Sequence, residues 1–227
     1  TKMNNMFYGA TSFNQNINTS GSSWNTAAVT NMAYMFYGAT AFNQNITSWN
    51  TAAVTDMHDM FRGATAFNGN ISSWNTAAVT KMNNMFFGAT SFNQPLTHSG
   101  NSWNLEDVTD MTNMFNGATG FSTANYDIFL NSQANNANIN SNITITAASK
   151  YSDATSRTFL TGIKNWTITD LGEEASVAPT VSSVTSTKAN GTYIIGALIP
   201  ITLTFNEVVN VTGTPQITLE TGGTDAV

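Results

Sequence analysis

The side chains in this sequence that could support catalysis or bind a metal are two histidines and a few carboxylates. His58 has Asp56 and Asp59 close to it, and a histidine beside carboxylates can serve as a general base or a metal ligand. Arg62 follows on the same stretch, and this spacing of charges favours a solvated, weakly paired surface. His98 lies in a stretch without acidic residues. Neither histidine is therefore predicted to act in catalysis or metal binding.

Other catalytic arrangements find no support in the sequence. Asp107 and Asp110 have the spacing of a carboxylate pair, but no calcium-loop motif accompanies them. The many serines and threonines have no base to activate them, and no phosphate-binding loop or nucleophile elbow is present. The absence of cysteine removes a thiolate nucleophile and a cysteine-ligated zinc site. We predict a non-enzymatic protein with no catalytic residues, no cofactor and no metal site.

Composition limits the classes of partner. The chain has 227 residues with a net charge of −6, and charged residues make up only 9%. Seven lysines and arginines are too few to form a basic surface for nucleic acid. No apolar stretch is long enough to predict a membrane span. The hydrophobic fraction of 41% is nevertheless sufficient for a core, which argues against wholesale disorder.

A repeated unit organises the first half of the chain. The string M-F-x-G-A-T recurs at intervals of 25 or 29 residues, beginning at Met6, Met35, Met60, Met85 and Met114. The first four copies are each followed by F-N and then W-N, and the longer units carry an insertion just before the Trp. So short a unit cannot bury its own apolar face, so neighbouring units must stack. This register predicts that Trp49 and Phe61 are interior residues stacked on their counterparts.

Two patterns alternate within the unit. Val54, Met57 and Met60 have the spacing of one helical face, and Gly63 follows where a left-handed residue would end the helix. Residues 42–49 lack helical spacing and are β-rich in character. The unit is therefore predicted to form one short strand and one short helix per coil, which is the anatomy of a leucine-rich-repeat-like solenoid. The recurring asparagines of F-N and W-N are expected to bond the backbone of its turns.

Comparison of the units also shows which positions vary. His58 stands where other units have Ala33, Asn83 and Thr112, and His98 falls in an insertion. Variable positions of this kind are more typical of exposed side chains than of catalytic ones. The x of M-F-x-G is also variable and mixes aromatic with polar residues, which predicts an exposed contact row formed by Tyr8, Tyr37, Arg62 and Phe87. Packing of these side chains against neighbouring coils is an equally weighted alternative.

The full unit, W-N-T-x-x-V-T-x-M-x-x-M-F-x-G-A-T-x-F-N-Q-x-I, resembles the bacterial surface-protein repeat of the BspA-like leucine-rich-repeat family. Residues 125–170 resemble the tail that commonly closes such arrays, so the resemblance covers residues 1 to about 172. It implies an extracellular, cell-surface, non-enzymatic protein used in adhesion. Met, Phe, Trp and Ile occupy the columns that are leucine in ordinary members, so the cross-section of the coil is expected to differ from the familiar horseshoe.

The decay of the repeat and a change of composition predict the domain organisation. The repeats extend to about residue 121, and the expected segments are a solenoid at 1–172 with a C-terminal cap over about 122–172, a linker at 173–179 and a partial immunoglobulin-like module at 180–227. In the cap, residues 126–130 predict a short helix and residues 139–145 an alternating strand.

The last part is predicted to be all-β, with strands at 181–184, 193–195, 201–205 and 216–219. It resembles the first half of an immunoglobulin-like module found in tandem on large bacterial adhesins. A complete sandwich needs roughly 100 residues, so the module is expected to be incomplete. Truncation of a longer chain is the favoured explanation, and completion by strands from other copies of the protein is the alternative.

The predicted function is that of a secreted or cell-surface protein that mediates adhesion, or serves as a structural module, by binding an extracellular protein or glycan through its solenoid face. One alternative is an accessory binding region of a larger extracellular enzyme. Another is an ice- or carbohydrate-binding solenoid, suggested by columns of threonine at Thr26, Thr51 and Thr76 and at Thr30, Thr55 and Thr80. The simpler account of these threonines is that they cap the predicted helices.

Overall fold

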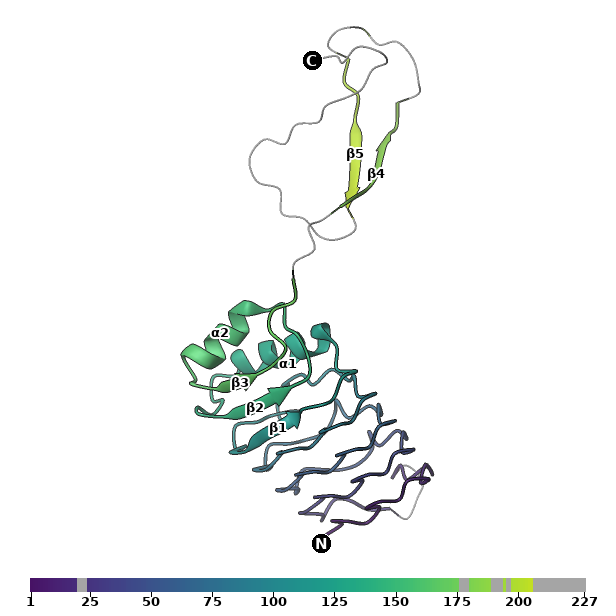
Figure 1. Ribbon diagram of the computed structural model, residues 1–227, viewed down its shortest axis with the longest axis vertical. Helices are drawn as coiled ribbons and strands as arrows, with labels where there is room; N and C mark the ends of the chain where they lie inside the picture. The colour runs from purple at the N-terminus through teal and green to yellow at the C-terminus, as the bar shows by residue number, and fades with distance from the viewer. Residues whose placement is uncertain (20–23, 176–179, 189–193, 195–196, 206–227) are drawn as a thin grey trace. The chain divides into compact units, whose positions relative to one another are not determined.

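The computed structural model describes residues 1–19, 24–175, 180–188, 194 and 197–205 (Figure 1). The chain divides into two compact units, residues 1–175 and residues 176–227. The boundary between them falls within the linker predicted from composition. The first unit contains the repeats followed by β1 (Met111–Phe115), α1 (Thr123–Ala134), β2 (Thr144–Ala147), α2 (Ala154–Gly162) and β3 (Thr167–Thr169).

The repeats form coils that stack in sequence order (Figure 1). Each coil pairs with the next in parallel at one equivalent position, through the bridges that connect Lys2, Asn31, Asp56, Lys81 and Asp110. Backbone hydrogen bonds extend these bridges. In each coil four alternate residues donate their N–H groups to carbonyls of the following coil, for example Met32, Tyr34, Phe36 and Gly38 to Asp56, His58, Met60 and Arg62 at 2.8–3.1 Å. We call this hydrogen-bonded side of the stack the ladder face.

The helix predicted in each repeat is wrong, because this stretch is a series of turns. Met60 and Arg62 donate to carbonyls three residues back, while Asp59, Phe61 and Gly63, which alternate with them, donate to the next coil. The backbone changes between right-handed and left-handed conformations along this stretch, since Asp59 has φ +55° and Gly63 has φ +68°. A helix would need all these N–H groups for itself. The left-handed conformation predicted for Gly63 is confirmed, although no helix precedes it.

The strand predicted at residues 42–49 is also wrong, because this stretch contains turns and irregular backbone. Side chains connect the coils here. The side-chain oxygen of Asn14 accepts from the backbone N–H of Asn43 at 2.9 Å, and the same bond recurs from Asn68 to Asn43 and from Asn93 to Asn68. The expected structural role of the F-N asparagines is confirmed, and the ladder that they form replaces the predicted strand.

A conformational test of the ladder face is available at Asn113, which lies inside β1 with φ +58°. Valine is normally a good strand residue. At this positive φ its branched side chain is strained, so Asn113→Val is expected to lower the free energy of unfolding by about 1–2 kcal/mol. Asn113→Gly should have little effect because glycine adopts this conformation freely. Urea denaturation of the two variants would compare them, and a more stable Asn113→Val would contradict the assigned backbone.

The core of the stack consists of columns of identical side chains. The rings of Phe61 and Phe86 are stacked at 5.7 Å between centroids, and those of Trp49 and Trp74 at 6.3 Å. All four residues are buried. The prediction that Trp49 and Phe61 are interior residues stacked on their counterparts is confirmed. Trp49, Trp74 and Trp103 also donate their indole N–H groups to an Ile carbonyl of the preceding coil, as Trp74 does to Ile46 at 3.2 Å.

The cap has the strand-and-helix anatomy that was predicted for the repeats. β1, β2 and β3 form a parallel sheet in that order, and α1 and α2 are the connections between them (Figure 1). The prediction of a helix at 126–130 is confirmed in α1. The strand predicted at 139–145 is mostly wrong, because residues 139–143 are bends and irregular backbone and β2 begins only at Thr144. Tyr126, Phe129 and Leu130 of α1 are buried, whereas Ile163, directly after α2, is exposed.

The second unit contains β4 (Val181–Ser186) and β5 (Ile201–Phe205), which pair in antiparallel fashion. These strands match two of the four runs predicted to be β-structure. The run at 216–219 lies outside the described residues, as does most of the run at 193–195, so the immunoglobulin-like module stays a prediction. Neither α1 nor α2, the helices of the described part of the chain, has the length and apolar character needed to cross a membrane.

Candidate functional site

The predicted contact row is a continuous stack of side chains along the ladder face. Tyr8 and Tyr37 lie with their rings nearly parallel and 4.6 Å apart. The guanidinium carbon of Arg62 is 5.6 Å from the centroid of the Tyr37 ring and 4.6 Å from that of Phe87. Arg62 is thus placed between two aromatic rings, an arrangement in which the cation is attracted to both ring faces. The structure therefore brings all four predicted residues together.

The stacking decides which parts of the row a partner could reach. Tyr8 is 54% exposed, while Tyr37, Arg62 and Phe87 are half-buried. The faces of Tyr37 and Phe87 are directed at their neighbours in the row. The sequence left two alternatives for these side chains, exposure and packing against neighbouring coils. Both occur within the row. At Tyr37 and Arg62 the row offers ring edges, a hydroxyl and a guanidinium to the outside rather than flat aromatic faces.

Tyr34 adds a second aromatic residue beside the row, which sequence reasoning missed. Its ring lies 6.0 Å from that of Tyr37 and meets the ring of His58 edge-on at 4.6 Å. Burial, followed by the charges of Asp59 and Asp56, raises the pKa of the Tyr34 hydroxyl, which is therefore a neutral donor at physiological pH. A signal for Tyr34 was present in the sequence. It immediately precedes an M-F pair, which is the position that Asp59 occupies in the next unit.

An ion pair orients the arginine of the row. Asp59 is only 3% exposed and accepts from Nη1 of Arg62 at 3.1 Å and from the Asn84 amide at 3.3 Å. The expected solvated and weakly paired cluster is thus wrong at Asp59, because its left-handed backbone turns the carboxylate in toward the next coil. A buried partner holds the guanidinium in one place, so that the row presents its remaining N–H donors in a fixed position.

The other residues that could have taken part in catalysis or metal binding form local hydrogen bonds instead. Nδ1 of His58 pairs with the Asp56 carboxylate. Asp110 accepts the backbone N–H of Thr112 at 3.0 Å, which ties it into a turn rather than into a pair with Asp107. Within the described part of the chain, no group of three or more His, Cys, Asp and Glu residues is arranged to hold a metal ion. These contacts explain the side chains as parts of turns between coils.

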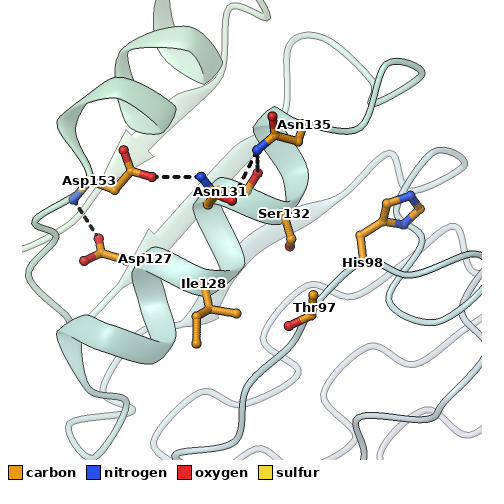
Figure 2. Close-up of a pocket in the computed structure, with 8 residues that line it drawn as sticks. All are labelled: Thr97, His98, Asp127, Ile128, Asn131, Ser132, Asn135 and Asp153. Carbon is orange, nitrogen blue, oxygen red and sulfur yellow. Dashed lines mark hydrogen bonds between the residues drawn. The ribbon is translucent and has the colours of Figure 1, made fainter.

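A pocket of about 700 Å³ lies where the last repeat meets the cap, and it was not predicted (Figure 2). The inserted stretch that contains His98 forms one wall of the pocket. The other wall is formed by α1 and by Asp153, the residue that caps the start of α2. Sequence reasoning missed it because these segments are far apart in the chain. Its lining consists of Thr97, His98, Asp127, Ile128, Asn131, Ser132, Asn135 and Asp153.

The two carboxylates of the pocket are already engaged in the cap. Asp127 accepts from the backbone N–H of Asp153 at 3.0 Å (Figure 2). It also accepts from the N–H of Ser152 at 2.9 Å, and Asp153 accepts from the N–H of Ser156 at the start of α2. Burial raises the pKa of Asp153, but hydrogen bonds from Ser156 and Asn131 outweigh it and lower the pKa below its usual value. The carboxylates thus hold α1 and α2 together, and the contact row is the better candidate for binding.

The threonine columns have structural roles. Thr26, Thr51 and Thr76 are buried, and the Thr51 hydroxyl donates to the carbonyl of Asn75 at 2.8 Å. Buried hydroxyls cannot contact ice or a carbohydrate. In the exposed column, Thr55 donates its hydroxyl to the carbonyl of Thr30 at 3.1 Å. The interpretation of these threonines as helix caps is wrong, because no helix follows them; they connect neighbouring coils instead.

Comparison with known proteins gives a family match. The sequence matches a family described as "Mycoplasma protein of unknown function, DUF285" over residues 1–129 and again over residues 45–166. No curated protein and no solved structure matches the chain. The two matched stretches together cover the repeats and most of the cap.

Proposed function

The chain belongs to the family described as "Mycoplasma protein of unknown function, DUF285", and we propose that it is a non-enzymatic interaction module that binds another protein through the contact row. The observation that carries this proposal is the row itself. Tyr8, Tyr37, Arg62 and Phe87 follow one another across four coils on one face. Tyrosine and arginine are enriched in protein interfaces, where each combines apolar contact with directed hydrogen bonds.

The arrangement of the rings favours a protein over a glycan as the partner. A sugar that stacks on an aromatic residue needs an open ring face, and within the row Tyr37 contacts Tyr8 and Arg62 while one face of Phe87 contacts Arg62. Ring edges, hydroxyls and a pre-oriented guanidinium instead suit carbonyls, carboxylates and apolar side chains of a polypeptide. The buried partner Asp59 lowers the entropy lost by Arg62 on binding, because the guanidinium is already fixed.

The wider setting follows from the resemblance of the repeat to BspA-like surface proteins. We interpret the coils as a leucine-rich-repeat-like solenoid of unusual cross-section, displayed on the outside of a cell or secreted. Residues 180–227 fit this setting as part of an immunoglobulin-like module that would extend the binding region away from its attachment. The stacked coils provide a long regular surface, which supports a role in adhesion.

Binding should depend on the row. In an array of purified secreted and cell-surface proteins, a Tyr8→Ser/Tyr37→Ser variant is expected to bind its partner at least tenfold more weakly than the original chain, because loss of two interface tyrosines removes more than about 1.4 kcal/mol. Tyr37→Phe, which retains the ring, should lose less. The exposed substitution Thr65→Ala, outside the row, is the matched control and should leave affinity unchanged.

Three outcomes would contradict the proposal. Equal affinities of the double variant and of Thr65→Ala would remove the row from the interface. Binding to a glycan array with no protein partner would assign the module to carbohydrate. Turnover of a substrate by the chain would show that it is an enzyme. Circular dichroism of each variant should match that of the original chain, so that lost binding is not lost folding.

A further inference from the structure

The cap shows how this protein holds a carboxylate with an arginine. The chain contains two arginines, Arg62 and Arg157. Nε of Arg157 donates to one carboxylate oxygen of Asp170 at 2.8 Å, and Nη2 donates to the other at 3.3 Å. The Tyr151 ring lies against the same guanidinium, with its centroid 4.6 Å from the guanidinium carbon. The arrangement thus combines an aromatic ring on the face of the cation with a carboxylate across two N–H groups at its edge.

Arg62 in the contact row has the same arrangement without the carboxylate at that edge. The centroid of the Phe87 ring is also 4.6 Å from its guanidinium carbon. The ion pair with Asp59 uses Nη1, at 3.1 Å. Nε and Nη2 donate to no atom of the described residues, and neither nitrogen is buried. We call these two N–H groups of Arg62 the open fork.

The surroundings of the open fork restrict the geometry of a ligand. Tyr37 and Phe87 lie against the guanidinium, so its edge is the route by which a polar group approaches. The two N–H groups lie in one plane and point the same way, which matches the two oxygens of a carboxylate. The buried Asp59 already fixes this plane, so little side-chain entropy is lost when the fork is filled.

The local charge favours a ligand with a single negative charge. Asp59 balances the charge of Arg62, and Asp56, which pairs with His58, belongs to the same coil. A phosphate group carries a charge near −2 and would meet more repulsion from these carboxylates than a carboxylate would. Both oxygens of a carboxylate can nevertheless accept from the fork, as Asp170 accepts from Arg157.

We infer that the open fork binds the carboxylate of an aspartate or glutamate side chain of the partner polypeptide, in the geometry that Arg157 makes with Asp170. The identity of the partner as a polypeptide rests on the proposed function, and the inference adds the chemical group that the row recognises. Tyr8, which is 54% exposed, and the edge of Tyr37 would contact the residues of the partner next to this carboxylate.

The first test observes the arginine Nε–H signals of the full chain by ¹⁵N NMR. There are only two arginines, so Arg62→Lys assigns both signals by removing one. Without ligand, the Arg62 signal should exchange with water faster than that of Arg157, which is bonded to Asp170. A blocked Gly-Glu-Gly peptide should shift the Arg62 signal saturably and leave the Arg157 signal unchanged. The blocked Gly-Gln-Gly peptide is the matched control and should bind about tenfold more weakly, because it lacks the charge.

Several results of this titration would overturn the inference without reference to any protein partner. Exchange at Arg62 as slow as at Arg157 would show that the fork is already filled. Equal binding of the two peptides, or no saturable shift, would show that the fork does not select a carboxylate. Tighter binding of a blocked Gly-phosphoserine-Gly peptide would assign the fork to phosphate instead.

A second test uses a protein partner identified with the array. Arg62→Lys keeps the positive charge but has no fork, so affinity should fall about tenfold. Lys81→Gln, which removes an exposed charge elsewhere on the ladder face, is the control and should leave affinity unchanged. If Tyr8→Ser/Tyr37→Ser weakens binding and Arg62→Lys does not, the row is still an interface and only the inference about the fork fails.

Discussion

Replacement of Trp49 by alanine is expected to lower the free energy of unfolding by about 3–5 kcal/mol, the usual range for removing a large buried aromatic side chain. The Trp49 ring lies between those of Trp24 and Trp74, with centroids 6.5 and 6.3 Å away. Its indole N–H donates to the carbonyl of Ile17 at 2.9 Å. The variant would therefore leave both a cavity in the ring column and a carbonyl without its donor. Urea denaturation would measure the loss.

Native-state hydrogen exchange should accompany this measurement, because stacked repeats can unfold in parts and a single unfolding free energy is then poorly defined. Trp49→Phe retains a ring but not the N–H, so its loss should be clearly smaller. Lys81→Ala, at an exposed position, should stay within about 0.5 kcal/mol of the original chain. A loss below about 1 kcal/mol for Trp49→Ala would show that the tryptophan column does not hold the coils together.

The second large effect is expected in the cap, where Arg157→Met should cost about 3 kcal/mol of stability. The Asp170 side chain is 2% exposed and accepts from Nε of Arg157 at 2.8 Å. Removal of Arg157 would leave a buried carboxylate without its cation, which is among the more destabilising single changes. The contact of the guanidinium with the Tyr151 ring, 4.6 Å away, would also be lost. Hydrogen bonding to Asp170 raises the pKa of Arg157 despite burial, consistent with this pairing.

A double variant separates the charge from the packing. Arg157→Met/Asp170→Asn has no buried charge, so it should recover a substantial part of the lost stability. Hydrogen exchange in α2 and β3 should report the effect locally, since Arg157 lies on α2 and Asp170 follows β3. If the double variant were as unstable as Arg157→Met, the unpaired charge would not be the cause.

Much of the interior could be predicted because the repeat places equivalent residues at equivalent depths. Trp49 and Phe61 are buried as expected, and Gly63 has the left-handed conformation expected from its place after the apolar run. These are properties of single positions, and several near-copies of a unit report each of them repeatedly. The contact row was predictable for the same reason, since Tyr8 and Tyr37 occupy one position of the unit in successive coils.

Local backbone structure was less predictable, because the partners of alternate backbone N–H groups lie 24 or more residues away. The spacing of Val54, Met57 and Met60 fits a helix and also fits turns that direct the same side chains inward. Only the neighbouring coil, which accepts alternate N–H groups, distinguishes them. Where a segment is long enough to keep its own hydrogen bonds, as in α1, the helix forms where the sequence indicated.

The sequence by itself determined the register of the stack, the side chains of its core and the residues that share the exposed row, because each of these follows from which residue types recur at which interval. The tertiary structure alone decided that the rings of the row face one another, that Asp59 is buried beneath Arg62, and that His98 meets α1 at a pocket. These outcomes depend on distances between segments remote in the chain, and such distances are set by how coils pack on one another.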